Sequence, residues 1–245
     1  MEDILKKRSL KLIGWLFIVC LTISCTSQLN QKGEILLITG GHDFDTTEFF
    51  NLFDSLTEYR VDTLSQPAAN HFIGSGKALN YDVLVFYDSW QEISDEEKKA
   101  YLGLTDKGIS FLFLHHSLVS YQDWEEFSKI RGGRYYKSEL SDSIKDSRYK
   151  HDLDLSVEIQ DSTHPITKGM RNFVIHDEGY SNIIFNVGVS PLLKTDDPDC
   201  AEMFAWTTKY RNSKIVYLMG GHDKMAFRNE NYKELIRGAL NYLGE

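Results

Sequence analysis

Two copies of one short motif place a histidine beside an aspartate. Gly40-Gly41-His42-Asp43 follows the apolar run Glu34–Thr39, and Gly220-Gly221-His222-Asp223 follows the apolar run Lys214–Met219. In an open parallel sheet, ligands bind in the crevice outside the carboxyl ends of the strands. If both runs are strands of such a sheet, both motifs lie on its binding rim. The alternative is that the glycines only turn the chain and each aspartate caps the next helix.

Three more polar groups are expected on the same rim. His115 and His116 directly follow the apolar run Ser110–Leu114, and Asp88 closes another strand-like run. The third group, His176–Tyr180, contains a histidine, two adjacent carboxylates and a tyrosine. We expect this third group to reach the rim from a long connection.

Proton transfer is the chemistry that these residue types suit. Imidazole is half protonated near a pH of about 6.5, and neighbouring carboxylates can have their pKa values pushed apart, so that one group serves as acid and another as base. The same side chains can ligate a divalent ion. Because no tightly spaced ligand motif such as His-Glu-x-x-His occurs, the sequence leaves a divalent metal cofactor open.

The segments that must position these groups alternate between strand-like and helix-like patterns. Asp45 with Glu48, and Ser94 with Glu97, are typical of helix starts. The last helix is predicted from the apolar stripe Tyr232–Leu243, which has helical spacing. This order predicts an α/β fold with a mainly parallel sheet and helices on both faces. The predicted strands are Glu34–Thr39, Tyr59–Leu64, Tyr81–Phe86, Ser110–Leu114, Leu153–Ile159, Pro191–Lys194, Met203–Trp206 and Lys214–Met219.

Other segments carry weaker patterns. Arg131–Asp152 shows no sustained period and is predicted to be a long loop. His71 and His151 have no supporting context and are expected on the surface. His164, which precedes a proline in a turn, is expected to hold a loop. Core packing is the expected use of the tryptophans, although an exposed one could stack on a sugar.

Four segments resemble the ThuA-like (trehalose utilisation) family. They are Leu114-His115, His164-Pro165-Ile166-Thr167, Asp177-Glu178-Gly179-Tyr180, and Trp206 followed by Gly221-His222-Asp223. Their order and spacing cover residues 34–243. Gly179 is a departure, since leucine is common at that place in the family.

The resemblance implies the fold of class I glutamine amidotransferases, and with it a flavodoxin-like sheet. In those enzymes the strand that corresponds to Ser110–Leu114 ends in a nucleophilic cysteine on a sharp elbow, whereas His115 stands here. No thiol is near it, and no Gly-x-Ser-x-Gly elbow occurs. Glutaminase or peptidase chemistry by that route is therefore excluded.

The resemblance also implies an enzyme of saccharide catabolism, a lyase, isomerase or hydrolase that acts on a sugar or keto-sugar derivative. Removing a proton next to a carbonyl needs a base, and the oxygen needs an acid. We predict that His115 and Asp177 fill these roles, while a metal could polarise the carbonyl. The predicted substrate-binding residues are His42, Asp43, Asp88, His116, Glu178, Tyr180, His222 and Asp223.

Two rival functions use the same crevice. One is a non-catalytic carbohydrate-binding lipoprotein, although simple sugar binding does not need so many titratable groups on one rim. The other is hydrolysis of a glycosidic bond by two carboxylates, which depends on a separation that sequence does not give.

The N-terminus is typical of an exported bacterial lipoprotein. Basic residues precede the apolar run Leu12–Ile23, which is shorter than the roughly 20 residues needed to span a bilayer. Leu21–Cys25 resembles a lipobox, with Thr22 in place of the usual leucine. We therefore expect residues 1–24 to be a signal peptide, Cys25 to be lipidated, and residues 25–33 to tether the domain 34–245 to a membrane, facing the periplasm.

Charge and cysteine content limit the classes of binding partner and the chemistry that the chain can have. Without residues 1–24 the chain keeps 23 basic and 34 acidic residues, a formal charge of −11. Such a surface repels nucleic acid and anionic lipid heads, so we expect a small carbohydrate as partner, no nucleic acid, and membrane contact through the lipid alone. Cys200 is the one cysteine left beyond the lipobox. We predict that it is structural, because its acidic neighbours disfavour a thiolate.

Overall fold

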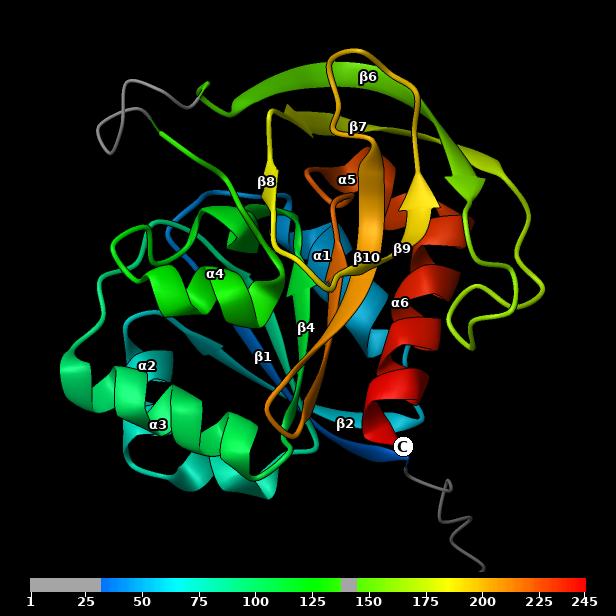
Figure 1. Cartoon of the computed structure of the whole chain (residues 1–245). Coiled ribbons are helices and arrows are strands. Elements are labelled where there is room, and N and C mark those ends of the chain that lie inside the picture. Colours follow the sequence, from blue (N-terminus) through cyan, green and yellow to red (C-terminus); the bar gives the residue numbers. More distant parts are fainter. Residues whose placement is uncertain (1–31, 138–144) are drawn as a thin grey trace, which may run out of the picture.

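The computed structural model describes residues 32–137 and 145–245 (Figure 1). The predicted signal peptide, Cys25 and most of the predicted tether lie outside these residues. Within them, no helix is both long and apolar enough to cross a membrane.

The fold is built around one nine-stranded sheet with the order β2-β1-β3-β4-β11-β10-β9-β6-β7. Two short strands, β5 and β8, pair separately. The strands are β1 (Gly33–Gly40), β2 (Tyr59–Ser65), β3 (Val83–Asp88), β4 (Ser110–Leu114), β5 (Gly133–Arg134), β6 (Arg148–Ile159), β7 (Phe173–Ser181), β8 (Ile184–Phe185), β9 (Ser190–Lys194), β10 (Met203–Tyr210) and β11 (Ser213–Leu218). The helices are α1 (Thr46–Asp54), α2 (Ala68–Gly74), α3 (Asp95–Asp106), α4 (Glu125–Arg131), α5 (Lys224–Arg228) and α6 (Glu230–Gly244), with 3₁₀ turns η1 (Lys77–Asn80) and η2 (His115–Val119).

The first five strands of the sheet, β2-β1-β3-β4-β11, are parallel to their neighbours. This is the strand order of flavodoxin-like folds. The predicted α/β, flavodoxin-like architecture is therefore confirmed. Its central strands are continuous apolar runs because both of their faces are covered, and every residue of Ser110–Leu114 is buried.

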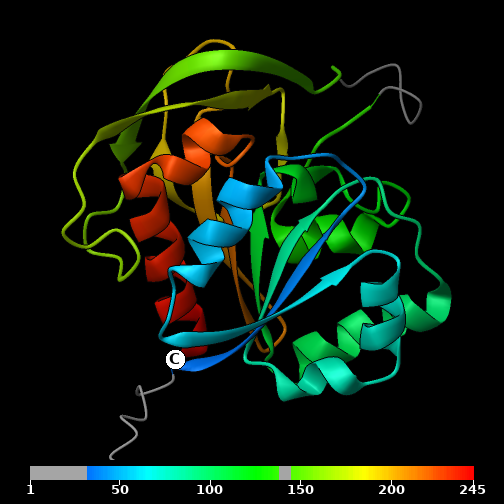
Figure 2. The ribbon, with the colours of Figure 1, turned by 180° about the vertical axis from the view of Figure 1, so that it is seen from behind.

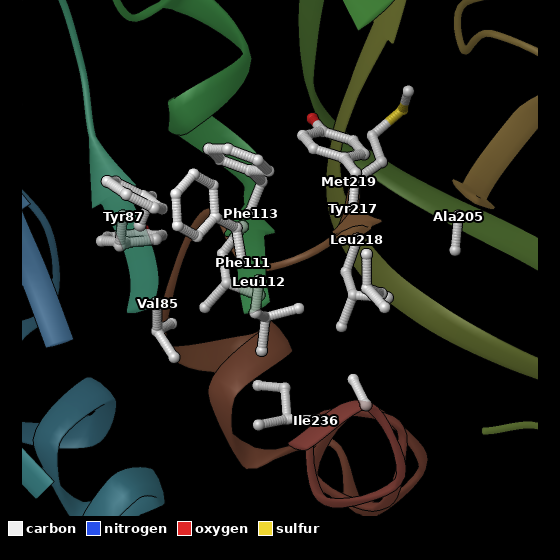
Figure 3. Packing of buried hydrophobic residues seen from close by; sticks show 14 of the residues in the cluster. Val85, Tyr87, Phe111, Leu112, Phe113, Ala205, Tyr217, Leu218, Met219 and Ile236 are labelled. Atoms are coloured by element: carbon white, nitrogen blue, oxygen red, sulfur yellow. The ribbon is translucent and has the colours of Figure 1, made fainter. Parts of the chain in front are cut away.

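Helices cover both faces of the parallel strands (Figures 1 and 2). Successive residues of β3 point to opposite faces. The ring of Phe86 lies 5.9 Å from Tyr101 of α3, whereas the ring of Tyr87 lies 4.4 Å from Phe49 of α1. In Figure 3, Leu112 of β4 points toward Ile236 of α6, and its strand neighbours Phe111 and Phe113 point away from that helix.

The helix starts differ in how they are capped. Ser94 and Glu97 form the predicted capping box of α3. Asp45 occupies the N-cap position of α1, but its side chain makes no hydrogen bond to that helix. Instead, its carboxylate accepts a hydrogen bond from the backbone N–H of Lys224 at 2.9 Å. Asp45 therefore ties the turn after β1 to the turn after β11.

The remaining strands, β10, β9, β6 and β7, extend the sheet in antiparallel fashion. β6 and β7 pass over the carboxyl ends of the parallel strands (Figure 1). The prediction of a long loop at Arg131–Asp152 was wrong at both ends, because β5 and the start of β6 lie within it. The first residues of β6 are exposed, so they show no hydrophobic alternation by which sequence could reveal a strand.

Candidate active site

A pocket lies at the carboxyl ends of the parallel strands, beneath β6 and β7. Residues that follow β1, β3, β4 and β11 form one side of it, and residues of β6 and β7 form the other. Four aromatic side chains, Trp90, Tyr135, Tyr149 and Tyr180, stand among its lining. Its titratable lining includes His42, His116, His151, Glu178, Tyr180 and His222.

Five histidines gather at this pocket, although they come from four separate segments. The ring of His116 lies 4.0 Å from His42, 4.5 Å from His115 and 5.4 Å from His222. His222 is also 6.1 Å from His42 and 4.8 Å from His151. The structure thus brings together His42, His115 and His222, the three histidines predicted to meet at strand ends.

The backbone of each turn is shaped to present its histidine. Gly41 and Gly221 have φ values of +83° and +111°. A Cβ would lie 1.8 Å from the Ser89 carbonyl oxygen at Gly41 and 2.2 Å from the Tyr232 hydroxyl at Gly221. Only glycine fits both the conformation and the space. His115 itself has a φ of +33°, a strained conformation of the kind that clusters at functional sites.

Glu178 is the central anion of the site. Its Oε2 lies 2.8 Å from Nε2 of His115 and 3.1 Å from Nδ1 of His222, and its Oε1 lies 3.5 Å from Nδ1 of His151. Burial alone would raise the pKa of this carboxyl. A hydrogen bond from His115 and the charges of His115 and His222 outweigh burial, so the pKa of Glu178 falls well below its ordinary value. The site therefore holds a buried carboxylate among imidazoles.

The neighbouring imidazoles respond in opposite ways. Burial lowers the pKa of His116 well below its ordinary value, and the charges of His115, His42 and His222 lower it further. Burial also acts to lower the pKa of His222, but the Glu178 carboxylate outweighs it and raises that pKa overall. Neighbouring histidines are thus held in different protonation equilibria, as acid and base chemistry requires.

His115, one of the two predicted catalytic residues, lies behind the pocket wall. Its side chain is 0% exposed and does not line the pocket. Nδ1 lies 2.5 Å from the Met219 carbonyl oxygen, and Nε2 faces Glu178. His115 therefore lies against pocket-lining residues, with its hydrogen bond to Glu178, and is not placed to touch a substrate as the predicted acid or base.

Asp177, the other predicted catalytic residue, also does not line the pocket. Its segment belongs to strand β7 and not to a connection, so adjacent side chains point to opposite faces. Glu178 points into the pocket, while Asp177 accepts hydrogen bonds from the backbone N–H groups of Gly221, His222 and Glu178 at 2.7, 2.9 and 2.8 Å. The structure gives Asp177 a positioning role in place of the predicted catalytic one.

Three aspartates predicted to bind substrate do not line the pocket either. Asp88 is completely buried, and its carboxylate accepts hydrogen bonds from Gln66 at 2.9 Å and Ser120 at 3.0 Å. Asp223 caps α5, as the structural alternative proposed. Asp43 is exposed beside the site and offers its carbonyl oxygen to Nδ1 of His42.

Several pocket residues were not predicted from the sequence. His151 was expected to be an ordinary surface residue; it is half exposed but contacts both Glu178 and His222. Trp90 and Tyr149 line the mouth of the pocket with 49% and 61% of their surface exposed. The one available signal was the spacing of Tyr149 and His151, two residues apart, which puts both on the same face of β6.

Trp124, Trp206, His164 and Cys200 have structural positions away from the pocket. Trp124 and Trp206 are buried in the core, as expected. His164 accepts a hydrogen bond from the Ile166 N–H within its turn. Cys200 is buried, and burial raises the pKa of its thiol to about 12. A thiol held this far from ionisation at neutral pH is not a nucleophile.

Comparison with known proteins identifies a family for this sequence. The ThuA family model, described as trehalose utilisation, matches residues 35–243. No curated protein matches the sequence.

Several solved structures are similar. A putative ThuA-like protein from Parabacteroides merdae has 18% identity over 85% of this chain and 88% of its own, with a TM-score of 0.69. A putative ThuA-like protein from Bacteroides uniformis has 18% identity over 86% and 91%, with a TM-score of 0.68. A cytoplasmic protein from Salmonella typhimurium has 11% identity over 85% and 98%, with a TM-score of 0.61. Identities this low establish the fold alone. The family match, which spans most of the chain, shows that this protein belongs to the ThuA family, whose description indicates a role in sugar metabolism.

Proposed function

We propose that the pocket is the active site of a saccharide-catabolism enzyme that acts by acid and base catalysis on a sugar or keto-sugar derivative. The observation that carries this proposal is the position of Glu178, a carboxylate at the pocket wall with His115, His151 and His222 within 3.5 Å of its oxygens. A preorganised carboxylate at the pocket stabilises positive charge that develops there during reaction, and so assists proton transfer to and from a bound substrate.

We assign the general acid and base to His42 and His151. Both line the pocket, and both are exposed enough to exchange protons with a substrate. Their ring centroids lie 6.1 and 4.8 Å from that of His222. Chemistry next to a sugar carbonyl needs a base to remove a proton and an acid to protonate the oxygen.

The pocket mouth supports a carbohydrate substrate. Trp90 and Tyr149 expose large aromatic surfaces there, and such surfaces can pack against the apolar face of a sugar ring. The ammonium of Lys137 lies 4.3 Å from the Trp90 ring centroid and can donate hydrogen bonds to hydroxyls. The same observation favours a second candidate function, sugar binding without catalysis, since stacking does not require an acid or a base.

Turnover by matched variants tests the proposal. The purified protein is incubated with oxidised and unoxidised disaccharides, and products are followed by chromatography. We expect His42→Gln and His151→Gln each to lower turnover by about 10²- to 10⁴-fold. His71→Gln removes an exposed histidine of α2 and should leave turnover unchanged. Calorimetry that detects sugar binding, combined with no product after prolonged incubation, would favour the non-catalytic candidate.

A further inference from the structure

Four side chains at the inner end of the pocket have the geometry of a metal site. His115, His116, Glu178 and His222, here called the floor cluster, each offer one ligand atom, and these atoms all lie within 4.8 Å of one another. The shortest separations, 2.8 and 3.1 Å, join Glu178 Oε2 to nitrogens of His115 and His222. Ligand atoms around a tetrahedral zinc ion with bonds of about 2.0–2.1 Å stand roughly 3.3 Å apart. The widest separations in the floor cluster would have to close by up to about 1.5 Å to reach that spacing.

The orientation of His115 is that of a metal ligand. A carbonyl oxygen can only accept a hydrogen bond, so the contact with Met219 fixes the proton of His115 on Nδ1. Nε2 then faces Glu178 with either a second proton or a shared cation between them. Metal-bound histidines almost always donate their other ring N–H to a carbonyl or carboxylate, which fixes the tautomer and the ring direction.

Two nitrogens of the floor cluster lack hydrogen bonds to any part of the chain that the structure describes. They are Nε2 of His116 and Nδ1 of His222, and both atoms are buried. Nδ1 of His222 lies 3.1 Å from a carboxylate oxygen, yet it makes no hydrogen bond to it. Buried polar atoms without partners are rare in folded proteins, and an ion is one recognised explanation.

We infer that the floor cluster binds a divalent transition-metal ion, with His115, Glu178 and His222 as ligands and His116 as a fourth. Three imidazoles and one carboxylate suit zinc, iron or cobalt better than magnesium or calcium, which prefer oxygen ligands alone. The inference rests on the proposed function and deepens it. A cation in this position that accepted a fifth ligand would polarise a substrate carbonyl, while His42 and His151 remain on the pocket wall to move protons.

Cobalt spectroscopy tests the site without any substrate. The protein is prepared without a histidine tag, stripped with a chelator and titrated with Co²⁺, whose visible absorption reports coordination by nitrogen ligands. We expect one Co²⁺ per chain, displaced by one equivalent of Zn²⁺. His222→Gln and Glu178→Gln should weaken Co²⁺ binding by at least about 10- to 100-fold, the loss that even an outer-shell change produces. His71→Gln is the matched control and should bind as the unaltered protein does.

The possible outcomes distinguish failure of the metal site from failure of the proposed function. No Co²⁺ absorption in stripped protein that melts normally would overturn the site, and so would full retention of binding by His222→Gln. Circular dichroism of each variant excludes loss by unfolding. Sugar turnover that persists after complete metal removal would overturn the catalytic role of the ion and leave the proposed acid and base chemistry standing. Metal binding at one equivalent in a protein that converts no sugar would support the site and count against the proposed function.

Discussion

The carboxylate of Asp177 holds the backbone of His222. Its Oδ1 accepts a hydrogen bond from the His222 N–H at 2.9 Å, and its Oδ2 accepts one from the adjacent Gly221 N–H at 2.7 Å. A strand that crosses the pocket thereby fixes the turn that carries a pocket imidazole. The position of His222 depends on Asp177 even though Asp177 does not line the pocket.

Asp177→Ala should destabilise the protein strongly. The change leaves three backbone N–H groups without their acceptor, and each buried unsatisfied group costs about 1–3 kcal/mol. We expect the free energy of unfolding, measured by urea denaturation, to fall by about 2 kcal/mol or more. Asp154→Ala removes an exposed carboxylate of β6 whose partner is His176, and it should cost less than about 1 kcal/mol. Equal losses for the two variants would contradict the positioning role.

Asp88 should make stability depend on pH. Burial raises the pKa of this carboxyl from 3.8 to about 6, although hydrogen bonds from Gln66 and Ser120 partly oppose the rise. The folded state therefore holds a proton that the unfolded chain has already lost between these values, so stability falls as pH rises through this range. The cost is absent below the unfolded pKa and complete above the folded one, and amounts to roughly 3 kcal/mol.

Asp88→Asn isolates this effect because the amide does not titrate. Thermal melts at several pH values should show a shallower fall in stability for the variant between pH values of about 4 and 6. The slope is the readout, since the amide can alter the hydrogen bonds to Gln66 at every pH. Parallel curves for the two proteins would show that Asp88 is not the responsible group.

Trp90 is expected to provide binding free energy for the sugar. Trp90→Ala removes the exposed ring at the pocket mouth and should weaken sugar binding about tenfold, or about 1.4 kcal/mol. Trp90→Phe keeps an aromatic face and should retain most of the affinity. Calorimetry provides both values, and unchanged affinity in the alanine variant would remove the stacking role.

We propose that lipid on Cys25 anchors the protein to a membrane, facing the periplasm. Cys25→Ala should then move the protein from the membrane fraction to the soluble fraction when cells are fractionated. Metabolic labelling with a fatty acid gives an independent readout, and label should be lost together with the membrane association. Unaltered fractionation of the variant would exclude lipid anchoring at this cysteine.

The parallel half of the sheet was predictable because each of its strands is recognisable from its own residues. Strands covered on both faces must be continuous apolar runs, and the runs at Glu34–Thr39 and Ser110–Leu114 are in the sheet interior as predicted. The polar start of β6 was not predictable in the same way. Its residues pair with β7 through backbone hydrogen bonds and leave side chains in solvent, so composition carried little signal.

The location of the site was predictable from the sequence, but which of its residues line the pocket was not. His42, His115 and His222 each follow a parallel strand, and topology alone brings such residues to one rim. Strand alternation in β7 put Asp177 and Glu178 on opposite faces. His115 begins the 3₁₀ turn after β4, and its side chain lies behind the pocket wall. His151 joined the site through β6, a strand distant in sequence from the rim motifs, and its spacing of two residues from Tyr149 was the one local pattern that pointed to it.

Proton NMR of a keto-disaccharide in deuterated water tests most directly whether this pocket is catalytic. Acid and base chemistry at this pocket predicts that the protein either exchanges the protons next to the carbonyl for deuterium or converts the sugar. His151→Gln and Glu178→Gln should slow this by about 100-fold or more, while His71→Gln should not. Binding of the sugar without any exchange or conversion, in protein that retains its fold, would contradict the claim that this pocket is catalytic.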